Sequence, residues 1–104
     1  MDIYEFQRRI NEYIARRERL DPAAVYEQLK DVYPVVLNME PAYDYEIPVL
    51  SGESSAGKFE LYDNGLDIIF DIYNPDGNYT HWHPESVAEA IEAVRKFMNG
   101  ACEH

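Results

Sequence analysis

The sequence predicts a single α+β domain. Apolar residues recur at three- and four-residue spacing near both ends of the chain, which indicates amphipathic helices. Between them, residues 58–83 alternate apolar and polar side chains around two glycine-containing turns, which indicates antiparallel strands. A chain of 104 residues has the size of one domain, so we expect residues 1–104 to share one hydrophobic core.

Two helices are expected at the start of the chain. Residues 2–19 place their apolar side chains on one helical face and most of five arginines elsewhere. The apolar positions are Ile3, Phe6, Ile10, Tyr13 and Ile14. Asp21 and Pro22 are a favoured N-cap and first helical residue, so a second helix should run from there to about residue 32. Its inward positions are Val25, Leu29 and Val32. The short connection predicts that the two helices pack as an antiparallel or angled pair.

Residues 34–57 have the weakest pattern. Two short apolar runs, residues 35–37 and 47–50, predict strands. Pro48 restricts the second run to a sheet edge, because proline has no N–H to donate. Residues 51–57 are small and polar, which is typical of a flexible loop. These runs would extend a sheet of three strands to four or five.

A three-stranded antiparallel meander is the clearest feature of the sequence. Residues 58–62 and 66–73 flank Asn64 and Gly65, a pair typical of a tight type I′ hairpin turn. A second turn at residues 74–78 leads into a third strand at residues 79–83. The alternation places apolar side chains on one sheet face and polar side chains on the other.

These two turns imply a register. The first pairs Phe59 with Phe70, and the second pairs Asp71 with His81. The expected apolar face carries Phe59, Leu61, Leu66, Ile68, Phe70, Ile72 and Trp82. The expected polar face carries Lys58, Glu60, Tyr62, Asp67, Asp71, Tyr73, Tyr79, His81 and His83, with Ile69 as its apolar exception. Because the apolar face must leave water, we expect helices to cover it.

A final helix should end at Met98, before Asn99 and Gly100. Pro84 fits its first residue, whereas Ser86 and Glu89 form a capping box that would start it slightly later. Its apolar stripe consists of Val87, Ala90, Ile91, Val94, Phe97 and Met98. We expect this stripe to pack on the apolar sheet face.

Charge is the outstanding compositional feature. The net charge is −11, and it is uneven, because residues 1–20 hold five arginines and four acids. Residues 40–76 hold nine acids and one base, Lys58. Such a field repels nucleic acid and anionic membranes and attracts cationic partners. We therefore expect a basic protein partner, although acidity also serves solubility alone.

Other features of the sequence concern the cellular compartment of the protein. The single cysteine, Cys102, cannot form an intramolecular disulfide, which suits a reducing compartment. The first residues are acidic rather than basic, unlike a signal peptide, and the longest apolar stretch, residues 66–73, is too short to span a membrane. These observations predict a cytoplasmic protein.

His81 and His83 are the one arrangement that suggests metal chemistry. Two histidines separated by one strand residue point to the same face, and Asp71 should lie beside His81. Such a trio could hold zinc or ferrous iron in a small metal-binding protein or metal-dependent enzyme. The simpler interpretation, half-exposed histidines that pair with acids at a strand end, is preferred. No catalytic residue and no cofactor is therefore assigned.

The nine tyrosines favour a binding surface instead. Tyrosine provides a large contact area and is enriched at interfaces, and acidic neighbours complement a basic partner. The expected contact set is Tyr43, Asp44, Tyr45, Glu46, Glu60, Tyr62, Asp67, Asp71, Tyr73, Tyr79 and His81. A DNA mimic, whose carboxylates imitate phosphates, is an alternative. Homodimerisation through an exposed sheet edge is compatible with each of these functions.

Three segments carry a resemblance to a known class. Residues 59–65 (FELYDNG), 77–84 (GNYTHWHP) and 90–98 (AIEAVRKFM) resemble small immunity proteins of bacterial toxin–immunity systems, including contact-dependent inhibition and related polymorphic toxins. The resemblance covers residues 58–98 and rests on hairpin turns and a capped helix. It implies a cytosolic protein that neutralises a toxin, often a cationic nuclease, by covering its active site. No individual functional residue is carried over.

Overall fold

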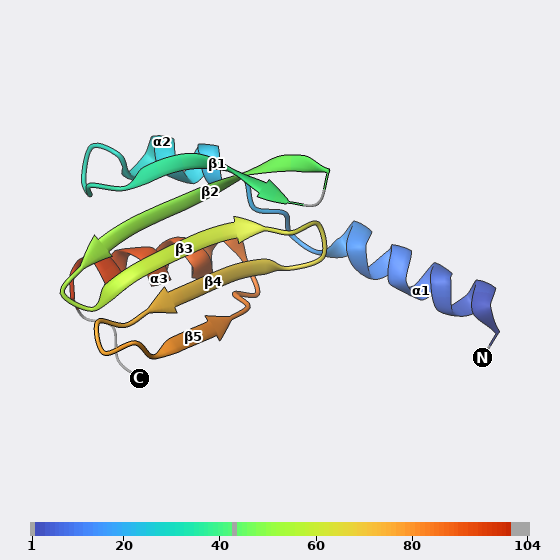
Figure 1. Ribbon diagram of the computed structural model, residues 1–104. Helices are drawn as coiled ribbons and strands as arrows, with labels where there is room; N and C mark the ends of the chain where they lie inside the picture. Colours follow the sequence, from blue (N-terminus) through green and yellow to red (C-terminus); the bar gives the residue numbers. More distant parts are fainter. Residues whose placement is uncertain (1, 43, 101–104) are drawn as a thin grey trace.

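The described residues form three helices and a five-stranded antiparallel sheet (Figure 1). A computed structural model of the protein describes residues 2–42 and 44–100. The elements are α1 (Ile3–Arg16), α2 (Pro22–Leu29), β1 (Val36–Ala42), β2 (Tyr45–Ser54), β3 (Gly57–Asp63), β4 (Ile68–Tyr73), β5 (Tyr79–Trp82) and α3 (Val87–Met98). Each strand pairs with the next along the chain, in the order β1-β2-β3-β4-β5. The expected α+β class and antiparallel meander are confirmed, with five strands.

The hydrophobic core lies between one face of this sheet and helices α2 and α3 (Figure 1). Its fully buried side chains include Val25 and Leu29 from α2, Leu50, Phe59 and Leu61 from the sheet, and Val94 and Phe97 from α3. The Phe59 ring stacks on Phe70 at 5.5 Å between centroids and meets the edge of Phe97 at 5.4 Å. Close-packed aromatic rings thus join α3 to β3 and β4.

The segment with the weakest sequence pattern forms two long strands. Residues 51–54, expected to be loop, belong to β2, and Ser55 and Ala56 make the turn into β3. Pro48 lies opposite Met39 on β1, outside the part of β2 from Leu50 onward that pairs with β3. At Pro48 the strand has one neighbour only, so the missing N–H breaks no β2–β3 hydrogen bond.

The β3–β4 hairpin is wider than the Asn-Gly pair predicts. The Asn64 side chain accepts hydrogen bonds from the backbone N–H groups of Leu66 and Asp67, both at 2.8 Å, and Asp63 pairs with Ile68. The register is therefore two residues from the expected one. A shift of two residues keeps each strand side chain on its expected face. Leu66 is the exception, because it lies exposed in the turn.

The β4–β5 register agrees with the sequence prediction, since Phe70 pairs with Trp82 and Asp71 with His81. At the start of α3, the Ser86 hydroxyl accepts a 3.0 Å hydrogen bond from the Glu89 N–H. This cap identifies the later of the two expected helix starts.

The two N-terminal helices differ from the prediction. Helix α2 ends at Leu29, three residues early, so that Val32 is exposed rather than inward. Helix α1 points away from the sheet instead of packing beside α2 (Figure 1), and the molecule measures 49 × 27 × 26 Å. Ile3 and Phe6 on its apolar face are 71% and 55% exposed. The 3.6-residue period predicted the helix but not what its apolar face contacts.

Candidate functional site

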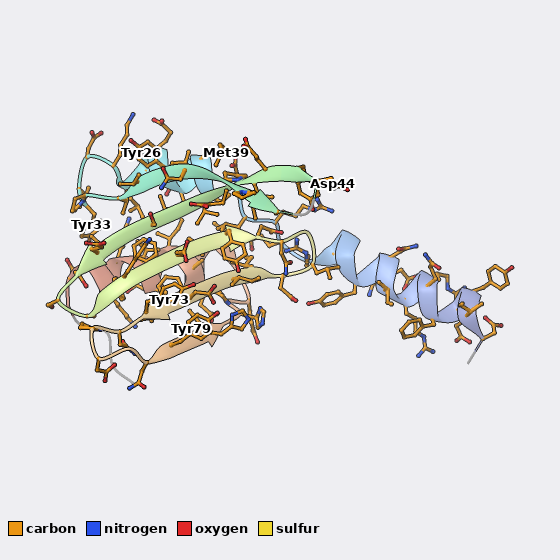
Figure 2. The ribbon with its side chains drawn as sticks, viewed as in Figure 1. Tyr26, Tyr33, Met39, Asp44, Tyr73 and Tyr79 are labelled. Carbon is orange, nitrogen blue, oxygen red and sulfur yellow. The ribbon has the colours of Figure 1, made fainter. Side chains whose placement is uncertain are left out.

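The sheet face opposite α2 and α3 is the candidate site, and we call it the open face. Strand alternation and the observed register assign its residues. They are Val36, Asn38, Glu40, Ala42, Tyr45, Ile47, Val49, Ser51, Glu53, Lys58, Glu60, Tyr62, Ile69, Asp71, Tyr73, Tyr79 and His81. Figure 2 shows Tyr73 and Tyr79 side by side on this face, where their ring centroids lie 5.1 Å apart.

Asp71 organises the centre of the open face. Its side chain is buried, with 3% of the residue exposed, and its carboxylate accepts hydrogen bonds from three side chains. The Tyr62 hydroxyl lies 3.3 Å from Oδ2, while the Tyr79 hydroxyl and His81 Nδ1 lie 2.9 Å and 2.6 Å from Oδ1. These groups and His83 form the Asp71 cluster. A buried carboxylate needs such donors, because leaving it unpaired would cost several kcal/mol.

The register of three strands produces the Asp71 cluster. Asp71 on β4 lies directly opposite His81 on β5, and Ile69 lies opposite Tyr62 on β3. Tyr62 and Tyr79 therefore approach Asp71 from diagonal positions two residues away, within reach of long aromatic side chains. Each donor comes from a neighbouring strand, so the cluster joins β3, β4 and β5.

Tyrosine hydroxyls on the open face resist ionisation. Burial, followed by the nearby Asp71 carboxylate, raises the pKa of Tyr62 to about 12. Burial and the Glu60 carboxylate raise the pKa of Tyr73 to about 12, and burial with Asp71 also raises the pKa of Tyr79. At neutral pH these hydroxyls keep their protons, and those of Tyr62 and Tyr79 donate to the Asp71 carboxylate.

The two histidines lie together but do not form the expected three-ligand metal site. His81 Nε2 lies 3.0 Å from His83 Nε2, and His83 Nδ1 lies 3.3 Å from the Ile68 carbonyl oxygen. Asp71 binds the Nδ1 side of His81, so its carboxylate does not converge with the two Nε2 atoms. Over residues 2–42 and 44–100, no group of three or more His, Cys, Asp or Glu side chains is arranged to hold a metal ion. The predicted trio of His81, His83 and Asp71 is therefore not gathered around one point in this structure.

A second polar arrangement fixes the chain between α1 and α2. Arg17 makes two hydrogen bonds to Asp63, at 2.6 Å and 3.0 Å, and the Leu20 N–H adds a third at 3.0 Å. Burial pushes the pKa of Asp63 upward, but the bonds from Arg17, Leu20 and Gly65 outweigh it and hold the pKa below its ordinary value. The hydrogen bonds to Asp63 likewise raise the pKa of Arg17. We call this pair the Arg17–Asp63 clamp.

A cleft of about 730 Å³ lies between the C-terminal half of α1, the β3–β4 turn and the residues that follow β5. Its lining includes Arg9, Arg16, Asp67, His83 and Glu85. Arginine and carboxylate side chains alternate around it, so the cleft has no single sign of charge with which to select an ionic ligand.

The expected contact residues lie in three places. Tyr62, Tyr73, Tyr79, His81 and Glu60 gather on the open face with Asp71, whose burial excludes the direct contact predicted for it. Asp44, Tyr45 and Glu46 lie at the β1–β2 hairpin, and Tyr43 lies outside the described residues. Asp67 lies in the β3–β4 turn, where it accepts a hydrogen bond from the Tyr13 hydroxyl at 3.3 Å.

Sequence reasoning missed the Arg17–Asp63 clamp and the carbonyl that orients His83. The two-residue spacing placed His81 and His83 on one side of the strand, and their Nε2 atoms do lie 3.0 Å apart. No local pattern links Arg17 with Asp63, because the residues are 46 positions apart in the chain.

In comparisons with protein-family models, curated proteins and solved structures, no significant match to this chain was found. Within the described part of the chain, every helix is too short or too polar to cross a membrane.

Proposed function

We propose that this protein is an acidic binding protein whose open face covers a basic surface of a protein partner. The observation that carries the proposal is that no helix of the described residues covers the open face, where Tyr73 and Tyr79 lie side by side (Figure 2) on a face that also carries several carboxylates. Helices α2 and α3 occupy the other face, so the open face can meet a partner without any rearrangement of the core.

The tyrosines on the open face are suited to contact. Tyr45, Tyr73 and Tyr79 are each more than two-fifths exposed, although hydrogen bonds or carboxylate neighbours fix the latter two. A tyrosine that is already held loses little rotamer freedom on binding and provides a large apolar area. Such residues commonly act as hot spots in interfaces.

The charge of the open face favours a cationic partner. The residues assigned to the open face include four carboxylates, from Glu40, Glu53, Glu60 and Asp71. Among these assigned residues, Lys58 is the one lysine or arginine. The surrounding net charge of −11 extends the same field over the molecule. Complementary fields of this kind accelerate encounter with a basic protein and disfavour acidic ones.

More specifically, we propose that the protein is an immunity protein. The resemblance of residues 58–98 to immunity proteins implies that the basic partner is a toxin nuclease, whose positively charged substrate groove the open face would block. The partner to be tested first is a toxin nuclease encoded next to this protein's gene, if the neighbouring gene encodes one.

The test uses two double variants with equal charge changes. Glu40→Lys with Glu53→Lys alters the open face, whereas Glu89→Lys with Glu92→Lys alters the exposed side of α3. We expect the first variant to slow association with the toxin by tenfold or more at low salt, on the order typical of lost electrostatic steering. The α3 variant should associate nearly as fast as the parent, because its lysines face away from the partner.

A second pair of variants locates the contact. Tyr79→Ala removes an exposed ring from the β5 edge of the open face, and Tyr45→Ala removes one from the β1–β2 hairpin. Faster dissociation of the Tyr79 variant would place the interface on the strands, and faster dissociation of the Tyr45 variant would place it at the hairpin. Equal association rates for the two charge variants at every salt concentration would refute the open face as the binding surface.

A further inference from the structure

Two histidine rings at the β5 edge of the sheet face one another through Nε2. His81 lies in β5 and His83 follows its last residue, and the two Nε2 atoms are 3.0 Å apart. The rings are nearly perpendicular, at 84°, with centroids separated by 4.5 Å. Neither ring is stacked on the other, so the contact is made by the nitrogen atoms.

The hydrogen-bond partner of each Nδ1 atom determines which ring nitrogen carries the hydrogen in the neutral histidine. His83 Nδ1 faces the Ile68 carbonyl oxygen, which only accepts, so Nδ1 must carry the hydrogen. His81 Nδ1 faces Asp71 Oδ1 at 2.6 Å. The same carboxylate already accepts hydrogen bonds from two tyrosine hydroxyls, so it acts as an acceptor toward Nδ1 as well. In the neutral state of both rings, each Nε2 is therefore an unprotonated lone pair.

Two lone pairs that face one another at 3.0 Å repel unless a cation lies between them. A shared proton would satisfy this distance as an ordinary N–H···N hydrogen bond. A metal ion would satisfy it as well, since two bonds of about 2.0–2.1 Å that meet at roughly 95° separate the nitrogens by the same amount.

The surroundings favour the metal. Histidines that ligate metals through Nε2 nearly always donate their Nδ1–H to a carboxylate or a backbone carbonyl, which fixes the ring and raises its basicity. His81 has the carboxylate and His83 has the carbonyl. His81 is also 40% exposed at its side chain, so water or a partner's side chain can fill the remaining coordination positions.

We propose that His81 and His83 form a two-histidine site for a divalent transition-metal ion that prefers imidazole, such as Zn²⁺, Ni²⁺ or Cu²⁺. Asp71 and the Ile68 carbonyl act as positioning groups and do not touch the metal. The site differs from a three-ligand centre in that the protein supplies two donors and leaves the rest of the coordination sphere open. This inference is independent of the proposed protein partner.

The experiment titrates NiCl₂ and ZnCl₂ into the full-length protein by calorimetry. Cys102 and His104 are the other strong metal-binding side chains, so the reference protein carries Cys102→Ser and His104→Ala. We expect this reference to bind one ion per chain and to melt at a higher temperature when the ion is present. Adding His83→Ala should abolish both effects and leave the hydrogen bonds of Asp71 in place.

Two further measurements separate ligation from a structural role. Asp71→Asn should weaken binding by about tenfold or more while retaining one ion per chain, as expected for a group that acts through His81. The Cu²⁺ electron paramagnetic resonance spectrum of the reference protein should show coupling to two nitrogens, and His83→Ala should reduce this to one. Absence of binding by the reference protein would show that the histidines share a proton only. If the His83→Ala variant still binds the metal ion and its Cu²⁺ spectrum still shows coupling to two nitrogens, the assignment is also overturned.

Discussion

Replacing Asp63 with asparagine tests whether the Arg17–Asp63 clamp is desolvated. The Arg17 and Asp63 side chains are 8% and 11% exposed, and the change leaves a nearly buried guanidinium without its counter-charge. Removing one partner of a buried ion pair costs about 3–5 kcal/mol, and we expect about 3 kcal/mol because some water still reaches Asp63. In a domain of this size each kcal/mol lowers the melting temperature by about 4–8 °C, which gives a fall of roughly 12–24 °C.

The assay is urea unfolding followed by the fluorescence of Trp82, the single tryptophan, whose ring meets the edge of Phe70. The control is Arg9→Gln, which breaks the exposed pair between Arg9 and Glu5 on α1. That pair should contribute no more than about 0.5 kcal/mol. If Asp63→Asn costs as little as this control, the clamp is not desolvated and the reasoning is wrong.

The same comparison has a defined pH dependence. The folded-state pKa of Asp63 lies below its ordinary value of 3.8, so the ionised carboxylate stabilises the fold above that pH. This contribution is lost as the pH falls from 3.8 through the lower folded-state value. The difference in unfolding free energy between the parent and Asp63→Asn should therefore stay constant near neutrality and shrink only in strong acid. A difference that shrinks between pH 5 and 7 would point to another group.

Two further predictions concern the sheet. In alkaline titration of the tyrosine absorbance, Tyr62→Phe should remove one group that ionises near pH 12. The unfolding free energy of the parent should fall between pH 10 and about 12, because the raised pKa of Tyr62 favours the neutral hydroxyl in the folded state. Ionisation of that group near pH 10 would contradict the buried hydrogen bond to Asp71. Gly57→Ala should cost at least about 2 kcal/mol more than Gly65→Ala in urea unfolding. Both glycines have positive φ, but a Cβ at Gly57 would meet the Tyr73 carbonyl oxygen at 2.1 Å, whereas one at Gly65 would meet no atom within 4 Å; equal costs would show that the contact relaxes freely.

The clearest parts of the sequence prediction concern elements whose signals are local. The period of α3, its Ser86 cap and the pairing of β4 with β5 each depend on neighbouring residues or a short turn, and the structure reproduces them. The shift in the β3–β4 register arose because Asn64 binds two backbone N–H groups with its side chain, which widens the turn. A dipeptide rule does not include this competition.

The sequence predicted which residues share the polar sheet face, but it did not predict the hydrogen bonds among them. Period-two alternation placed Tyr62, Asp71, Tyr79 and His81 together, since the direction of a strand side chain depends on its position alone. The burial of Asp71 followed only when β3 and β5 brought three donors to one carboxylate.

The sequence alone determined the α+β class, the acidic middle of the chain, the capped final helix and the two faces of the meander. Each of these depends on composition or on spacing within a few residues. Only the tertiary structure decided that α1 stands apart from the sheet, that Arg17 binds Asp63 and that His81 faces His83 through Nε2. These contacts join residues by distance and orientation in space, and neither quantity is contained in a one-dimensional pattern.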